Sequence, residues 1–270
     1  MRNNVDSPEN SIRFLGQDGF WIRNQDCNFL IDPYLSNYVV DGGIGPADLF
    51  SREFPIPVDI AEMRGVEYVF VTHDHADHCD PDTLLPLLQA NPKMKIVCPY
   101  TAKAHLLSLG VLSSSIIVPE AGILNKIGAI EYYAVPAAHY GFDLEAATGG
   151  YGYFGYVIKI GSSWLYHAGD TILYDGMVEA ILQYTAKIDI ACLPVNGRDG
   201  WRERMGLIGN LDGAEALELA VRLHADVLIP MHNDLFAVNH VNMSVLADLL
   251  DRKAPRQKVH WLQPGETYFY

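Results

Sequence analysis

The chain has 270 residues, of which 49% are hydrophobic and 19% charged, so it can form a sizeable core without disulfide or other cross-links. It carries 19 Lys and Arg against 33 Asp and Glu, which gives a formal net charge of −14, and no segment concentrates enough basic residues to follow a phosphate backbone. Long nucleic acids are therefore not expected partners, whereas a small anionic substrate remains compatible with the composition.

The sequence contains no candidate membrane span. No segment approaches the roughly 18 consecutive apolar residues that a spanning helix needs. The first eight residues also lack the apolar stretch that is typical of a secretory signal. We therefore expect a cytoplasmic protein.

The four cysteines are scattered along the chain without a Cys-x-x-Cys pair, and three of them lie in or beside apolar runs. They are Cys27, Cys79, Cys98 and Cys192. This usage predicts reduced, buried thiols. Cys79 directly follows His78 and is therefore a possible further metal ligand, although histidines and carboxylates nearby already provide enough donors.

Apolar runs of strand length alternate with helix-like segments through the whole chain, which predicts one α/β domain over residues 1–270. The expected strands are 13–23 and 28–32, forming an opening hairpin, followed by 68–71, 95–99, 116–119, 130–136, 156–160, 164–166, 190–195 and 226–231. The expected helices are 80–88, 101–109, 177–187 and 212–224. Residues 33–64 are rich in Gly and Pro breakers and predict a long irregular loop, which is a candidate cover for a site.

One seven-residue run, Thr-His-Asp-His-Ala-Asp-His at 72–78, directly follows the apolar strand 68–71. Three imidazoles and two carboxylates at the end of a rigid strand are the ligands that divalent ions prefer. A polar surface loop with histidines is the alternative. Three later residues also end β-rich runs and precede loops, where an α/β scaffold presents its chemistry. They are His139, Asp170 and His232.

In this order, these residues resemble the metallo-β-lactamase superfamily, whose hallmark is His-x-His-x-Asp-His followed by a separate His, an Asp after Gly and a last His. The segments 14–21, 72–75, 166–170 and 229–234 look most like the L-ascorbate 6-phosphate lactonase branch. The resemblance covers residues 12–270. It implies a four-layered αβ/βα sandwich, with two facing sheets, helices outside and metals at one edge, in a protein that forms homo-oligomers.

The resemblance also implies a dinuclear metal site. The first ion would be held by His73, His75 and His139, the second by Asp77, His78 and His232, and Asp170 would bridge them. All of these donors are nitrogen or oxygen, which admits zinc, manganese or iron. The similar lactonases use manganese, so we expect one or two divalent ions, manganese or zinc.

The leading functional hypothesis is a metal-dependent hydrolase that opens a sugar-type lactone, possibly phosphorylated, with Asp77 and Asp234 as the catalytic carboxylates. Asp234 would donate a proton to the leaving alkoxide, or else accept a hydrogen bond that orients an imidazole. Asp74 and His167 would have supporting roles. A phosphodiesterase acting on a small cyclic or lipid-like diester, and a metal-binding protein without turnover, are the two alternatives.

Two segments are candidates for substrate contact. Arg198, Arg202 and Arg204 form the densest basic loop after a site-bearing strand and would suit a phosphate, or they are a solvated loop paired with neighbouring acids. The loop 140–156, rich in Gly and Tyr, either lines the substrate pocket or is an ordinary connection whose tyrosines pack on the sheet.

Overall fold

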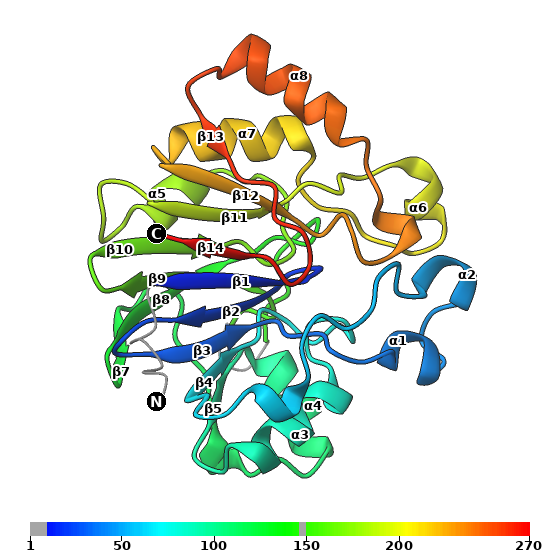
Figure 1. The fold of residues 1–270 in the computed structure, drawn as a ribbon, viewed down its shortest axis with the longest axis vertical. Helices are drawn as coiled ribbons and strands as arrows, with labels where there is room; N and C mark the ends of the chain where they lie inside the picture. The colour runs from blue at the N-terminus through cyan, green and yellow to red at the C-terminus, as the bar shows by residue number, and fades with distance from the viewer. Residues whose placement is uncertain (1–9, 146–149) are drawn as a thin grey trace, which may run out of the picture.

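The computed structural model describes residues 10–145 and 150–270. Two seven-stranded sheets face each other, and helices cover the outer face of each (Figure 1). The predicted four-layered α/β sandwich is confirmed. Three short 3-10 helices complete the described elements: η1 (Ile60–Glu62), η2 (Ser113–Ser115) and η3 (Ala237–Asn239).

The first sheet contains the N-terminal strands and one strand from the C-terminus. In spatial order it comprises β14 (Thr267–Phe269), β1 (Ser11–Gly16), β2 (Gly19–Arg23), β3 (Asn28–Ile31), β4 (Tyr68–Phe70), β5 (Lys95–Val97) and β6 (Ile116–Ile117). From β14 to β3 the strands are antiparallel, and from β3 to β6 they are parallel. Its outer face is covered by α3 (Pro81–Ala90) and α4 (Tyr100–Ser108), whose buried leucines join the core cluster on that side.

The second sheet contains the later strands. In spatial order it comprises β13 (Lys258–Val259), β12 (Val227–Met231), β11 (Ile190–Pro194), β10 (Ser163–His167), β9 (Phe154–Ile160), β8 (Ile130–Pro136) and β7 (Asn125–Ile127). The strands from β10 to β13 are parallel. On its outer side lie α5 (Met177–Ile181) and α7 (Gly213–Arg222), and α8 (Met243–Lys253) packs on α7.

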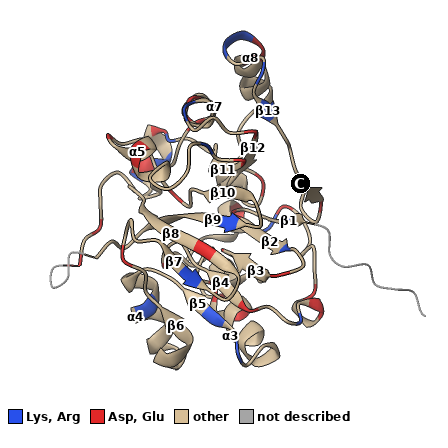
Figure 2. Cartoon of the chain, turned by 90° about the vertical axis from the view of Figure 1, so that its left-hand side faces the viewer, with Lys and Arg blue, Asp and Glu red and all other residues tan. Residues whose placement is uncertain are grey.

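Charged residues are spread over the surface elements. Figure 2 shows Lys and Arg segments on several elements, with acidic and uncharged segments between them. Within the part of the chain that the structure describes, no helix has the length and apolar character needed to cross a membrane.

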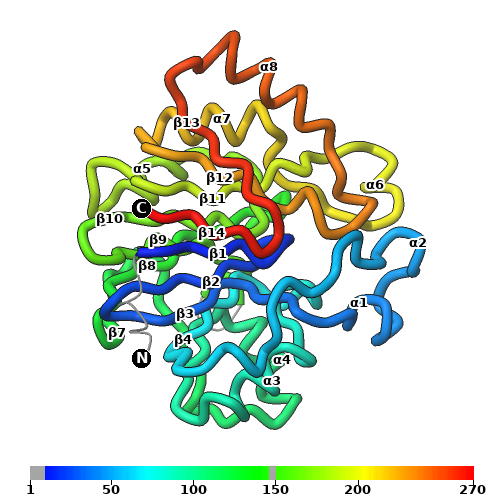
Figure 3. The backbone as a smooth tube through the Cα atoms, viewed as in Figure 1, coloured from blue at the N-terminus to red at the C-terminus, as the bar shows by residue number. Residues whose placement is uncertain are grey.

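The path of the chain brings the C-terminus back to the first sheet. After β6 the chain crosses to the second sheet, builds it through to β13, and returns as β14 beside β1 (Figure 3). The short helices α1 (Tyr38–Asp41), α2 (Ala47–Phe50) and α6 (Gly200–Arg204) lie together at the edge of the sandwich away from the C-terminus. This edge carries the candidate site.

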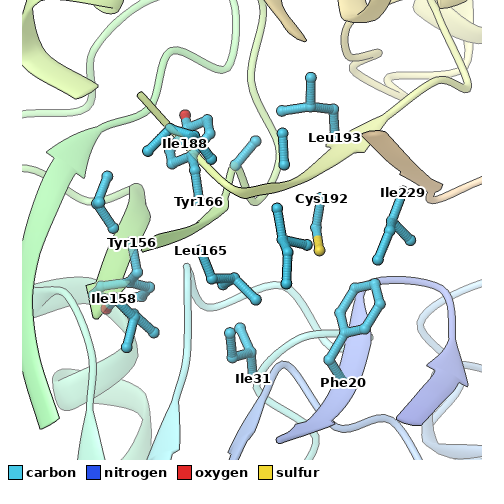
Figure 4. Packing of buried hydrophobic residues seen from close by; sticks show 14 of the residues in the cluster. Phe20, Ile31, Tyr156, Ile158, Leu165, Tyr166, Ile188, Cys192, Leu193 and Ile229 are labelled. Atoms are coloured by element: carbon cyan, nitrogen blue, oxygen red, sulfur yellow. The ribbon is translucent and has the colours of Figure 1, made fainter. Parts of the chain in front are cut away.

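Alternating side chains of the first sheet build two separate cores. Phe20 and Ile22 of β2 point between the sheets, whereas Trp21 points toward α3 and α4. This is the period of two that a strand imposes on its side chains. Figure 4 shows Phe20 and Ile31 packed against residues of the second sheet such as Cys192 and Ile229. All four cysteines are buried and free, as predicted.

Two local predictions were wrong. The segment 13–23 is two strands, because Gln17 adopts a positive φ of 56° and the chain turns there. The helix expected over 177–187 ends at Ile181, and the Thr185 hydroxyl donates to the carbonyl of Lys187, a local bond that competes with helix continuation. Helix α7 does begin after Asp212, which forms a capping box with Glu215.

Candidate metal centre

The predicted metal ligands come together at one edge of the sandwich because each follows the carboxyl end of a strand. The run 73–78 follows β4, His139 follows β8, Asp170 follows β10 and His232 follows β12. Two contacts tie the loops of the two sheets together. The Phe154 amide donates to the Thr72 carbonyl at 2.9 Å, and a Cβ on Gly169 would lie 2.8 Å from the Thr72 Cβ, so glycine is needed before Asp170.

The donors predicted for the first ion are neighbours. Donor atoms of His73, His75 and Asp170 all lie within 4.8 Å of one another, and His73 Nε2 is 3.9 Å from Asp170 Oδ2. The ring of His139 has its centroid 5.2 Å from that of His75. These four side chains therefore surround one volume from three different loops.

The donors predicted for the second ion lie on the other side of Asp170. Its Oδ1 is 3.2 Å from His232 Nε2 and 3.7 Å from His78 Nε2, which is in turn 3.7 Å from Asp77 Oδ2. Asp170 thus turns one carboxylate oxygen toward each group of histidines. This is the geometry that a bridging ligand requires.

Buried nitrogens test whether these residues suit a metal. His73 Nε2 and His78 Nε2 are buried and have no hydrogen-bond partner among the described residues. Such atoms are costly to bury unless something binds them. Both face the centre of the site, and the surrounding donors are imidazole and carboxylate, the set that divalent ions such as zinc and manganese take. The residues present therefore fit a divalent metal.

The outer nitrogens of the same two rings are fixed by Asp32, which follows β3. Its carboxylate accepts hydrogen bonds from the Thr72 amide at 2.8 Å and from the Thr72 hydroxyl at 2.5 Å. The hydroxyl lies 2.9 Å from His73 Nδ1, and the Asp32 carboxylate lies 2.8 Å from His78 Nδ1. Protons on both Nδ1 atoms satisfy these contacts and leave both Nε2 lone pairs for a metal.

We expect Asp32→Asn to weaken metal binding by about 10- to 100-fold, the usual effect of losing a partner that orients a ligand. The Asn side chain has one oxygen, so it cannot accept from the Thr72 backbone amide and from His78 on separate oxygens as the carboxylate does. Competition with a chelator measures the affinity, and Asp226→Asn, at an exposed surface position, is the control. An unchanged affinity would show that the ring orientation does not depend on Asp32.

Histidines predicted for the first ion and those predicted for the second ion have different pKa values. Burial lowers the pKa of His139 to about 4, and burial together with the neighbouring His78 ring lowers that of His73 well below its ordinary value. Burial would also lower the pKa of His232, but the carboxylates of Asp170 and Asp18 together outweigh burial and raise this pKa to about 9. The carboxylates of Asp77 and Asp170 likewise raise the pKa of His78. The rings of His73 and His139 are thus neutral at pH 7, whereas those of His78 and His232 hold protons.

Two residues of the site were missed by the sequence interpretation, Gln17 and Asp18 in the turn between β1 and β2. Gln17 Nε2 donates to Asp77 Oδ2 at 2.7 Å and lies 3.2 Å from His232 Nε2. The Asp18 carboxylate is fully buried, has no hydrogen-bond partner in the described ranges, and groups with His78, Asp170 and His232. The only sequence feature that could have indicated these two residues is a pair of polar residues between two apolar strands.

Tyr153 belongs to the loop 140–156 that the sequence indicated as a candidate for substrate contact, and it lies against the predicted ligands. Its ring stacks on those of His73 and His139, with centroids 4.8 and 5.2 Å away, and its hydroxyl lies 3.2 Å from His75 Nε2. It therefore fixes three predicted ligands of the first ion at once.

The other predicted residues have mixed positions. Asp234 is half-buried, and its Oδ1 accepts a hydrogen bond from the Gln17 amide at 2.9 Å. Burial raises the Asp234 pKa to about 6. His167 is fully buried, with Nε2 2.9 Å from the Asp18 carbonyl, and Asp74 is half-buried. Cys79 packs in the core under α3 and is in none of the donor groups of the described residues.

The arginine loop supports the interpretation of paired charges. Arg198 makes two hydrogen bonds to the Glu215 carboxylate, and Arg202 is bound to the side chain of Asp199 and to the Asn196 carbonyl. Arg204 is exposed at the end of α6. These contacts already use the guanidinium groups of Arg198 and Arg202.

The tyrosines of the loop 140–156 divide between the two alternatives, because Tyr153 contacts predicted ligands and Tyr156 lies in the core. The Tyr140 hydroxyl donates to Glu203, Tyr151 contacts Phe142, and the Tyr156 hydroxyl donates to the Val71 carbonyl in the core. Residues 146–149 of this loop lie outside the described residues.

A cavity of about 450 Å³ opens onto the centre. His75, Asp77, His139, Asp170 and His232 form its inner end. Residues predicted for both ions therefore face one space that a small molecule can enter.

Comparisons with known proteins agree with this geometry. A family model described as a beta-lactamase superfamily domain matches residues 27–233. A UPF0173 metal-dependent hydrolase of Symbiobacterium thermophilum is 30% identical over 259 residues, which cover 95% of this chain and 98% of that protein.

Solved structures show the same fold. A possible metal-dependent hydrolase from Veillonella parvula aligns with a TM-score of 0.75 at 17% identity and covers 97% of this chain and 100% of that one. An isothiocyanate hydrolase from Delia radicum gut bacteria aligns with a TM-score of 0.73 at 21% identity, covering 96% and 98%.

The family match includes all seven predicted metal ligands, since it extends from before His73 to beyond His232. The resemblance to the L-ascorbate 6-phosphate lactonase branch stays a prediction. With the donor geometry, the family model and the full-length relatives in agreement, the chain is a metal-dependent hydrolase that belongs to the metallo-β-lactamase superfamily.

Proposed function

We propose that this hydrolase opens a lactone, with His73, His75 and His139 holding one divalent ion, Asp77, His78 and His232 a second, and Asp170 between them. The observation that carries the proposal is Asp170, whose two oxygens face the two groups of histidines at the inner end of the cavity. When bound, manganese or zinc ions there would supply a water nucleophile at neutral pH and polarise the substrate carbonyl.

The residues around the centre would orient the reacting groups. Gln17 holds the Asp77 carboxylate through its side-chain amide at 2.7 Å, and Asp77 itself lines the cavity. Asp77 is therefore placed to keep a carboxylate oxygen toward the substrate. The ring of Tyr153 stacks on that of His139 with centroids 5.2 Å apart, which would hold this predicted ligand in place.

The leaving alkoxide of an opened lactone needs a proton, and Asp234 has a candidate group for it because burial raises its pKa to about 6. Asp234 is not among the residues that line the cavity, however, and one oxygen already accepts from the Gln17 amide. We therefore favour a positioning role for Asp234, in which it holds the turn that carries Gln17. Asp77 would then be the nearer carboxylate for proton transfer.

Asp234→Asn separates these roles, because the amide oxygen can still accept from the Gln17 amide but the side chain cannot donate the carboxyl proton. A positioning role predicts kcat within a few-fold of wild type and an unchanged pH profile. A proton donor predicts a loss of about 10²- to 10⁴-fold. That loss should be smaller for substrates with better leaving groups, so kcat for an alkyl and an aryl ester should be compared across pH.

A phosphodiesterase is the second candidate, since the same donor set serves both reactions and the cavity has apolar walls that suit a lipid-like diester. A protein that binds metal without turnover is less well supported. Metal binding alone does not require a cavity that gives a small molecule access to the predicted ligands of both ions.

Proton release by manganese-loaded and zinc-loaded protein tests the proposal. The panel should contain lactones with and without phosphate, and cyclic and linear phosphodiesters. Turnover of lactones alone would support the proposed reaction. Turnover of diesters alone would move the assignment to the second candidate, and no turnover of any member would count against both.

A further inference from the structure

We infer that the substrate of this site carries an apolar tail, which the outer walls of the cavity bind while the metal centre receives the hydrolysable group. The inference rests on the proposed hydrolase function and adds to it the chemical class of substrate. It replaces the phosphorylated sugar of the sequence interpretation with an alkyl or aryl lactone or ester.

The cavity has two chemically different parts. Its inner end consists of the predicted metal ligands, and its remaining lining is dominated by aliphatic and aromatic side chains. The large apolar residues that line it are Val39, Ile44, Leu49, Phe50, Met205, Leu207, Ile208, Phe236 and Val238. A polar reacting group and an apolar tail would therefore each meet matching surface.

The apolar walls come from segments that are far apart in the sequence. One wall belongs to the segment with α1 and α2, a second to the residues just after α6, and a third to the loop after β12. The third wall is firmly packed, since Phe236 is buried against Tyr34 and Phe50. Chain segments from both halves of the fold thus converge to enclose the same space.

Several of these side chains are exposed although they are large and apolar. Ile44 is 57% exposed and Ile208 is 44% exposed, and both line the cavity. An isolated exposed apolar residue needs no explanation, but a group of them around one concave site marks a binding surface. Covering them with an apolar ligand would remove this surface from water.

The charges around the cavity argue against a phosphate at its outer end. No Lys or Arg is among the described residues that line it, whereas Asp77 and Asp170 lie at its inner end. Arg198 and Arg202 lie on another cavity, where their guanidinium groups bind Glu215, Asp199 and backbone carbonyls. A phosphate at the apolar end would lack a counter-charge, whereas an uncharged tail needs none.

Alkyl carboxylates of increasing length test the inference by binding, independently of turnover. Titration calorimetry with butyrate, hexanoate and octanoate on the metal-loaded protein should give an affinity that rises about fourfold per methylene, which corresponds to about 0.8 kcal/mol. The heat capacity change should become more negative along the series. An affinity that does not change with chain length would overturn the inference.

Ile208→Asn should remove most of this dependence on chain length, because it places a polar group in the cavity wall. Leu112→Asn is the matched control, since Leu112 is 71% exposed and lies outside the cavity. Equal behaviour of the two variants would contradict the inference. If Ile208→Asn does not fold, Met205→Ala at a second exposed wall position provides the same comparison.

Hydrolysis of γ-butyrolactone and of longer γ-alkyl lactones separates this inference from the proposed function. Turnover of all members with equal kcat/KM would keep the lactonase and reject the apolar tail. Binding that strengthens with chain length, without turnover of any lactone, would keep the apolar tail and reject the lactonase. A kcat/KM that rises with the tail would support both.

Discussion

Replacing Asp170 with Asn should lower metal-dependent hydrolysis by more than about a hundredfold while leaving the chain folded. Loss of a group that merely orients a ligand already costs about 10- to 100-fold, and Asp170 faces both groups of histidines directly, with Oδ2 3.9 Å from His73 Nε2 and Oδ1 3.2 Å from His232 Nε2. Asn offers only one oxygen acceptor in the same shape. Metal content per chain and kcat/KM should therefore fall together.

The matched control is Asp248→Asn, which makes the same chemical change at an exposed position of α8. Its activity and metal content should remain those of wild type. His139→Ala provides a second test, because it removes a predicted ligand of the first ion only. Wild-type activity in both Asp170→Asn and His139→Ala would reject the assigned centre.

The residues that the structure brings together as candidate ligands could be picked out from the sequence, because each depends mainly on local pattern. A polar residue directly after a strand places its side chain at the edge of the sheet. The run 73–78 after β4 therefore places several donor side chains at the end of one strand. The alternation of apolar residues in Phe20, Trp21 and Ile22 similarly follows from the strand period.

Gln17 and Asp18 show what local pattern cannot supply. Gln17 contacts Asp234 across a sequence separation of 217 residues and Asp77 across 60. Which loops meet at an edge is decided by sheet order, here by β1 lying beside β14 and β2 in the first sheet. The sequence shows a polar pair in a turn, and only the assembled fold gives that pair its neighbours.

The cavity walls were likewise predicted from the sequence only in part. The segment 33–64 is predicted as a loop that covers the site, and Val39, Ile44 and Phe50 do line the cavity. Its short helices α1 and α2 were not predicted, because four-residue helices carry too little periodicity to be recognised. The second wall, from Met205 to Ile208, follows a helix that has no apolar repeat.

We expect the two ions to differ in the protons that they displace. A histidine must be neutral to bind a metal. Burial lowers the pKa of His139 to about 4, so this ring is already neutral at pH 7. His232 is instead protonated there, because the carboxylates of Asp170 and Asp18 together overcome burial and raise its pKa to about 9. Binding of the second ion should therefore release a proton from His232, whereas His139 should release none when the first ion binds.

The sign of the pH dependence follows from this difference. The affinity for the second ion should rise by about tenfold per pH unit for each proton released, and level off as pH approaches the His232 pKa of about 9. The affinity for the first ion should stay nearly constant well above the His139 pKa of about 4. Zinc titrations in buffers of different ionisation enthalpy measure the number of protons released at each step.

His232→Gln gives the matched test, because it removes the ring whose pKa is raised by Asp170 while leaving His73 and His139 in place. Its remaining first-ion step should match that of wild type in both affinity and proton release. Equal proton release at both wild-type steps would mean that the carboxylates do not favour protonated histidine in the second half. The two ions would then bind without a difference in proton release. Proton release at the second step alone would instead make the occupancy of the second ion depend on pH.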